Sequence, residues 1–464
     1  MLSKAKDVEC IRKTQLKPNG EIRYHIFPNG LRFIYEPIYT NSPITTIVAY
    51  CNVGSANETN EIRGAAHFIE HCIFKGTRKL SNIDIFMQYD NAGASINAYT
   101  EKRFTKYFVK VPADKTNTCV QILGDMLLHS TFSSREFVKE EKVVIEENLR
   151  SADDPLSTID DMYNSLIYAG TSYECPIDHI SYHKHPFSRQ KILDFYRLFY
   201  CPDRIILSIV SSLSYQQIIK MVEKSPFAKN IIHANIDKNR DAIRFLPPTP
   251  QSGILYKVFN QPNLNTIHMT ISFRTCSLFS NDVHIFKLLQ HIMSGTFGSM
   301  LSVILREENG LTYTSDSMIQ HIETTGDFTI YVQLDKTKLL HNGKNPGVLP
   351  IIIHLLNSLV QDGVPKKTFQ TAKTNMRGKM MLGIEHSNIQ ASHNGLEWLL
   401  YSKIESVIPY QDLYKSTIEP IRLQDINNII RHYFKKSAMF VCLVGSSLPS
   451  EKSIQRECEK FRPV

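Results

Sequence analysis

The chain has 464 residues, of which 42% are hydrophobic and 21% charged, a composition typical of globular proteins with apolar cores. This length exceeds what one ordinary domain needs and suffices for two or three. The formal charge is +8 at pH 7, but the Lys and Arg residues are spread along the chain without a basic block. The composition therefore argues against a nucleic-acid-binding protein.

The cysteines and the N-terminus bear on the compartment. Nine cysteines are scattered without a C-x-x-C pair, which predicts reduced thiols rather than a disulfide framework. The first twenty residues contain no apolar run, so they do not resemble a secretory signal. They carry Asp7 and Glu9, which is a weaker argument against a mitochondrial presequence. No apolar stretch is long enough to span a bilayer. We expect a cytoplasmic protein, with a mitochondrial location left open.

In the first half, strand and helix patterns alternate. Residues 44–55 are rich in β-branched side chains and predict a strand, and residues 64–74 follow with a helical pattern. Residues 93–111 alternate as a strand would. A helix is predicted to begin near Ser133, which forms a possible capping box with Glu136, and to end before Asp154-Pro155.

The second half repeats this scheme. Residues 266–275 predict a strand and residues 282–293 a helix. Both halves also end alike, with a helical stretch that leads into an apolar strand, at 204–213 in the first half and at 438–448 in the second. The offset between these two strands is about half the chain, as a duplicated domain would give.

These patterns predict an α+β fold with two homologous domains, each a mainly antiparallel sheet covered by helices. A Pro- and Asn-rich region, residues 229–263, reads as a linker. The predicted domains are therefore residues 1–228 and 264–464.

A metal-binding motif lies in the first predicted helix, where residues 67–71 read His-Phe-Ile-Glu-His. One helical turn separates His67 from His71, so both imidazoles face the same way and can share one Zn²⁺. Glu70 projects near the same position, where a carboxylate can take a proton from water and pass it to a leaving amine. This order, H-x-x-E-H, is the inverzincin pattern.

A third ligand is needed, because a catalytic zinc site has three protein ligands and an open fourth position. Glu140 and Glu147 lie two turns apart on one face of the helix predicted to follow Ser133. Glu147 could bind zinc, and Glu140 could hold a ligand imidazole or the ion from the second shell. From the residues alone, both could equally be solvated acids on a charged helix.

The segments NVGSANE, RGAAHFIEHCIFKGT and VVIEENLRSADDP together resemble the family of pitrilysin, insulysin and mitochondrial processing peptidase. That family has H-x-x-E-H followed some seventy-five residues later by a Glu ligand. The resemblance covers nearly the whole chain. It implies a zinc metalloendopeptidase with one Zn²⁺ per chain, held by His67, His71 and Glu147, with Glu70 as general base and Glu140 as the family's second acid.

The resemblance also implies substrate contacts. The family presents an edge strand that pairs with the peptide backbone, which assigns Asn97 and Ala98 to substrate binding. In the second half, Arg306 and Tyr313 match a paired Arg and Tyr that meet the substrate carbonyl and its developing oxyanion. From the sequence alone, residues 93–111 could be an ordinary strand, Arg306 a surface ion-pair partner and Tyr313 a half-buried ring.

The second-half helix keeps only His291 where the first half has a ligand, with Lys287 and Gln290 at the other positions. The second domain is therefore expected to bind substrate without zinc. The resemblance implies a half-clamshell that encloses unfolded peptides or presequence-like segments as a homodimer or with a related subunit. The alternative is a non-catalytic subunit that only presents substrate.

Overall fold

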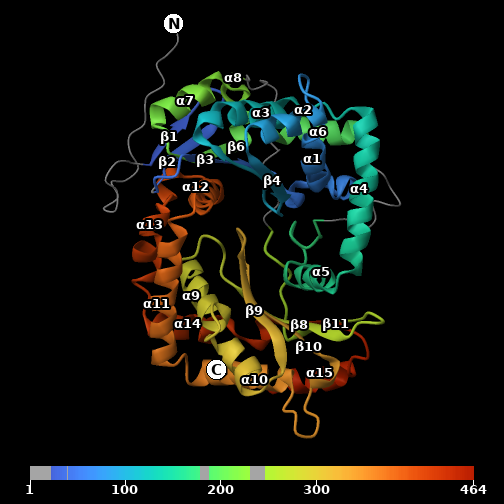
Figure 1. The fold of residues 1–464 in the computed structure, drawn as a ribbon. Coiled ribbons are helices and arrows are strands. Elements are labelled where there is room, and N and C mark those ends of the chain that lie inside the picture. The colour runs from blue at the N-terminus through green and yellow to red at the C-terminus, as the bar shows by residue number, and fades with distance from the viewer. Residues whose placement is uncertain (1–21, 39, 178–187, 230–245, 464) are drawn as a thin grey trace. The chain divides into compact units, whose positions relative to one another are not determined.

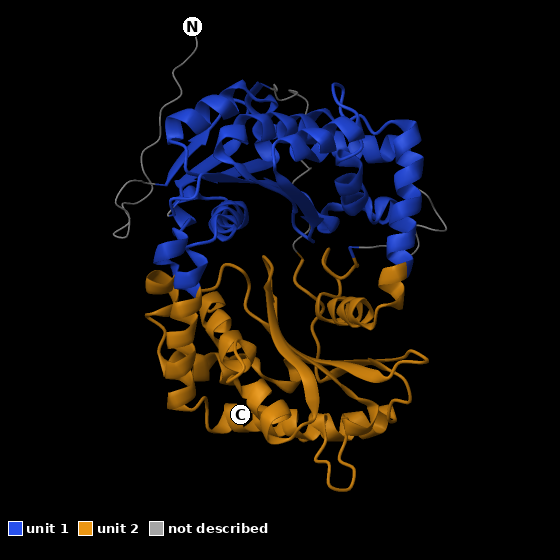
Figure 2. Cartoon of the chain, viewed as in Figure 1, with its two compact units in different colours: residues 1–149, 177–243, 380–413 blue, residues 150–176, 244–379, 414–464 orange. Residues whose placement is uncertain are grey.

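The computed structural model describes residues 22–38, 40–177, 188–229 and 246–463. The N-terminal twenty residues and part of the predicted linker, 230–245, lie outside these ranges. The chain divides into two compact units (Figure 2), residues 1–149, 177–243 and 380–413 in the first and residues 150–176, 244–379 and 414–464 in the second. Compared with the predicted continuous domains 1–228 and 264–464, the units exchange segments 150–176 and 380–413.

The first unit is built on a six-stranded sheet with the order β1-β2-β6-β3-β5-β4. Five of these strands, all except β5, are labelled in Figure 1. All neighbours are antiparallel except β2 and β6. The central strand β6 is buried along its whole length, which explains its continuous apolar run. The strands are β1 (Arg23–Ile26), β2 (Arg32–Pro37), β3 (Ile44–Cys51), β4 (Ser95–Thr100), β5 (Thr105–Pro112) and β6 (Ile205–Ser211).

Helices cover both faces of this sheet. On one face, strand residues such as Phe33 and Leu207 share a core with Phe68 and Leu123 of the helices. On the other face, α12 (Ser387–Tyr401) packs on β3 and β6 through Trp398 and its neighbours. The remaining helices of the unit are α1 (Ala65–Ile73), α2 (Asn82–Asn91), α3 (Thr116–His129), α4 (Ser134–Asp153, continuing into the second unit), α6 (Arg189–Phe199), α7 (Tyr215–Lys224), α8 (Pro226–Lys229) and α13 (Tyr410–Leu413).

The second unit has a five-stranded sheet with the order β7-β11-β8-β10-β9, in which only β7 and β11 are parallel. One helix, α5 (Pro155–Ile167), packs on β8 and β11. The strands are β7 (Leu255–Asn260), β8 (Thr266–Thr275), β9 (Thr312–His321), β10 (Gly326–Asp335) and β11 (Met439–Gly445). The other α-helices are α9 (Val283–Ser294), α10 (Val348–Gln361), α11 (Lys366–Gly383, continuing into the first unit), α14 (Leu423–Tyr433) and α15 (Glu451–Cys458).

The two sheets repeat one topology. The series β2-β6-β3-β5-β4 in the first corresponds, strand by strand and with the same directions, to β7-β11-β8-β10-β9 in the second. This repeat confirms the predicted α+β fold of two related, mainly antiparallel units. Two details of the prediction were wrong. The predicted linker contains a strand, β7, and residues 93–111 form two strands, β4 and β5, rather than one.

Within the described ranges, no single helix is long and apolar enough to cross a membrane. The helices α10 and α11, bent by 98° at the break between them, have the length and apolar composition of a membrane span only when they are taken together.

Candidate metal centre

Helix α1 presents both predicted histidine ligands on one face. Its N-cap is Gly64, whose φ of +88° is a conformation that favours glycine. The apolar side chains of Phe68 and Ile69 are fully buried in the core of the first unit. Because these residues fix the inner face of the helix, His67, Glu70 and His71 lie on its partly exposed face.

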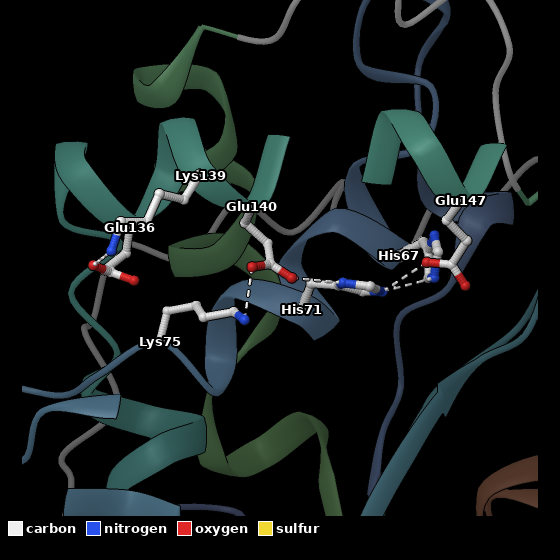
Figure 3. Close-up of polar contacts among 7 residues, drawn as sticks. All are labelled: His67, His71, Lys75, Glu136, Lys139, Glu140 and Glu147. Carbon is white, nitrogen blue, oxygen red and sulfur yellow. Dashed lines mark hydrogen bonds and ion pairs between the residues drawn. The ribbon is translucent and has the colours of Figure 1, made fainter. Parts of the chain in front are cut away.

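The three predicted ligands converge (Figure 3). The Nε2 atoms of His67 and His71 are 3.2 Å apart, and His71 Nε2 lies 3.4 Å from Oε2 of Glu147. One ligand atom from each residue lies within 4.8 Å of the other two. Zinc–ligand bonds of about 2.0–2.2 Å in a tetrahedron separate neighbouring ligand atoms by about 3.3–3.6 Å. Two imidazoles and a carboxylate at these spacings fit Zn²⁺.

Glu147 comes from α4, which also carries Glu140 two turns earlier. The start of this helix fits the prediction, since Ser133 Oγ accepts the backbone N–H of Glu136 at 3.4 Å, and the helix ends at Asp153, before Asp154. The rings of Phe68 on α1 and Phe137 on α4 are in edge contact at 4.8 Å between centroids. This contact joins the two helices that supply the ligands.

Glu140 orients His71. Its Oε1 lies 2.8 Å from His71 Nδ1 and its Oε2 lies 2.7 Å from Nζ of Lys75. Burial raises the pKa of Glu140, but the hydrogen bonds from His71 and Lys75 outweigh this effect, so its pKa lies below the usual value. An ionised Glu140 accepts the Nδ1–H of His71, which leaves the lone pair of Nε2 facing His67 and Glu147.

Glu70 lies beside the last residue of the edge strand β4. The hydroxyl of Thr100 donates to Oε2 of Glu70 at 2.8 Å. Burial raises the pKa of Glu70, while Thr100 and the two histidines lower it. The position expected for a general base is therefore held at one end of β4.

Among the strands of the described residues, β4 pairs with β5 alone, so its other edge carries no described strand of the first sheet. Its residues alternate between exposed and partly buried, and Asn97 is exposed. The side-chain oxygen of Asn97 accepts the N–H of Ala98 at 2.8 Å. The predicted substrate contacts thus lie on an edge strand whose end contacts Glu70.

Arg306 and Tyr313 lie together in the second unit. The guanidinium carbon of Arg306 is 5.4 Å from the centre of the Tyr313 ring, and its Nε is 3.5 Å from Oε1 of Glu307. The Tyr313 side chain is 86% exposed, so the alternative of a half-buried ring was wrong and its hydroxyl is accessible. Their role at the metal stays a prediction.

The helix equivalent to α1 in the second unit is α9. Its His291 is buried, with Nε2 2.9 Å from Oδ1 of Asn375, and the Gln290 side chain donates to the Ser317 carbonyl at 2.9 Å. Both side chains thus have hydrogen-bonding partners within their own unit.

Sequence reasoning missed two residues of the centre, Lys75 and Thr100. Lys75 follows His71 by four residues, and this spacing was the available signal that it could reach the same neighbour. Thr100 is 30 residues from Glu70, and no local pattern joins them.

Comparison with known proteins identifies the family of the chain. Residues 38–177 match the model of Insulinase (Peptidase family M16), and residues 186–376 match that of the Peptidase M16 inactive domain. An uncharacterized zinc protease of Bacillus subtilis is 27% identical over 92% of this chain and 100% of its own length. One of Rickettsia felis is 25% identical over 88% of this chain and 93% of its own.

Solved structures show the same fold. A protease from Helicobacter pylori has a TM-score of 0.83 and 18% identity, covering 91% of this chain and 99% of its own. A peptidase M16 inactive domain from Pseudomonas fluorescens has a TM-score of 0.76 and 14% identity, covering 93% and 99%. Together the two family models match most of the sequence, one after the other. The chain therefore belongs to peptidase family M16, the insulinase family, and contains two domains of that family.

Proposed function

We propose that the chain is a zinc-dependent endopeptidase that hydrolyses unfolded peptides. The observation that carries this proposal is the convergence of His67, His71 and Glu147, with Glu70 hydrogen bonded to the end of a free-edged strand. The names of the relatives, both zinc proteases, support the same chemistry.

His67, His71 and Glu147 would hold one Zn²⁺. When bound, such an ion polarises a carbonyl and makes water a stronger acid. Glu140 and Lys75 hold the imidazole of His71 in the tautomer that a metal needs, with its Nε2 unprotonated. The ligands are thereby arranged before any metal arrives.

Glu70 would take the proton of the attacking water and later give it to the leaving amine. Thr100 fixes one carboxylate oxygen of Glu70, Oε2, and leaves Oε1 to accept the proton. Because the pKa of Glu70 is raised by burial, its carboxylate is a stronger base than an exposed one. Arg306 and Tyr313 would supply donors to the oxyanion.

The free edge of β4 would bind the peptide. A peptide added as a further strand pairs with its neighbour through main-chain hydrogen bonds, which tolerate many sequences. A peptide on β4 would run past Thr100 and so past Glu70. This arrangement favours extended, unfolded substrates over folded ones.

The test compares Glu70→Gln with wild type on a mixture of quenched fluorescent peptides. Zinc should stay bound at about one per chain, because the side chain at this position is not a ligand, while turnover falls about 10²–10⁴-fold. Glu136→Gln on α4, which loses ion pairs with Lys139 and Arg135, is the matched control and should cleave normally.

A Glu70→Gln variant that cleaves at the wild-type rate would contradict the role of Glu70. A wild-type chain that binds zinc but cleaves none of the peptides would instead favour the non-catalytic subunit.

A further inference from the structure

A buried carboxylate at the start of α1 has no part in the chemistry proposed above. Glu58 is 7% exposed, and its two oxygens accept backbone N–H groups from Gly64, at 2.8 Å, and Ala66, at 2.7 Å. The first N–H groups of a helix lack partners within it, and the N-cap Gly64 has no side chain to supply one. Glu58 therefore caps α1 from outside the helix.

The segment that carries Glu58, residues 54–58, is also bound to the turn after β4. The N–H of Ser55 donates to the carbonyl of Glu101 at 3.2 Å, and that of Ala56 to the carbonyl of Lys102 at 2.8 Å. A Cβ atom on Gly54 would lie only 2.1 Å from the Glu101 oxygen, so the close approach requires glycine. We call residues 54–58 the bracing segment.

The bracing segment thus connects two parts of the site. One end contacts the turn that directly follows Thr100, and the other end caps the helix turn that contains His67. His67 is the third residue of α1, next to Ala66, whose N–H is bound by Glu58. Any shift of this first turn would move His67 relative to both His71 and β4.

We propose that Glu58 is a positioning residue that sets the place of the metal-ligand helix α1 against the edge strand β4. The importance of Glu58 rests on the proposed function, but the contacts that Glu58 makes are independent of that function. A carboxylate suits the position because both oxygens accept hydrogen bonds and because negative charge is stabilised at a helix N-terminus.

The substitution Glu58→Gln separates this role from simple space filling. Glutamine has nearly the same shape, but it offers one oxygen and turns the other position into an NH₂ group that faces an N–H donor. One of the two bonds to α1 is therefore lost. The matched control is Glu61→Gln, three residues further on, whose side chain is 76% exposed and pairs with Lys191 at 2.8 Å.

The experiment measures zinc affinity by chelator competition and the visible absorption of the Co²⁺-substituted full-length chain, beside kcat and KM on the peptide mixture. Burial raises the pKa of Glu58 to about 8, although the two N–H donors act to lower it. The measurements are therefore made above that pH, where the carboxylate is ionised. The expected result for Glu58→Gln is about 10- to 100-fold weaker zinc binding and an altered Co²⁺ spectrum, with kcat reduced more than KM is raised. Glu61→Gln should match the wild type.

A folded Glu58→Gln variant with wild-type zinc affinity and Co²⁺ spectrum would overturn the proposal. If that variant does not fold, Glu58→Asp replaces it, because it keeps the charge but shortens the reach. An unchanged Glu58→Asp would then overturn the proposal, whereas weaker zinc binding would support it.

The outcomes also distinguish the two proposals. A wild-type chain that binds zinc and cleaves no peptide contradicts the proposed function, while the metal measurements still decide the role of Glu58. A wild-type chain that binds no zinc contradicts both.

Discussion

Replacing Glu140 by Gln should weaken zinc binding without unfolding the chain. Glu140 is buried, and its two oxygens lie 2.8 Å from His71 Nδ1 and 2.7 Å from Lys75 Nζ. Glutamine keeps one acceptor but presents an NH₂ group to the other donor, so one charge-assisted hydrogen bond is lost. Such a bond contributes about 1.5–3 kcal/mol, which corresponds to about 10- to 150-fold in metal affinity if the loss falls on the orientation of His71.

The assay is a competition titration with a chromophoric chelator, with thermal unfolding of the metal-free chains measured in parallel. Glu136→Gln is the control, since Glu136 lies one turn earlier on α4 and its ion pair with Lys139 is at the surface. It should bind zinc as the wild type does. Equal zinc affinity in the Glu140→Gln variant and the wild type would refute the prediction that Glu140 orients His71 for metal binding.

Two further predictions concern the second unit. Tyr313→Phe removes only an exposed hydroxyl, so zinc content and melting temperature should be unchanged while kcat on peptides falls about 10²–10³-fold, and an unchanged kcat would exclude Tyr313 from the reaction. Asp327 is 1% exposed, accepts hydrogen bonds from Tyr168 and Thr329, and has its pKa raised by burial to about 7. Because the folded-state pKa lies above the unfolded value of about 3.9, its stabilising contribution is present at low pH and lost as pH rises through about 7. The melting temperature of Asp327→Asn should therefore fall less than that of the wild type as the pH rises from about 4 to about 7, and equal slopes would contradict this assignment.

The parts of the candidate site whose arrangement follows from the sequence depend on helical spacing. His67 and His71 are one turn apart, and Glu140 and Glu147 are two turns apart, so each pair had to share a face once its helix formed. That α1 and α4 meet followed from the family resemblance rather than from spacing. The contact between Phe68 and Phe137 shows how the packing brings it about.

The features that were missed depend on contacts between distant residues. Thr100 reaches Glu70 across 30 positions, and Glu58 caps a helix through backbone groups, which leave no side-chain pattern. The exchanged helices α5 and α12 have no local sequence pattern that indicates which sheet each one covers. Strand β7 was hidden because it is short and largely exposed, in a region rich in Pro and Asn.

The most direct test of the metal centre is the zinc content of the purified wild-type chain beside Glu147→Gln. Glu147 supplies the only carboxylate among the three converging ligands, from a different helix than the two histidines. We predict about one zinc per chain in the wild type, and loss or clear weakening in the variant. A wild-type chain that holds no zinc, and takes up none on titration, would contradict the account.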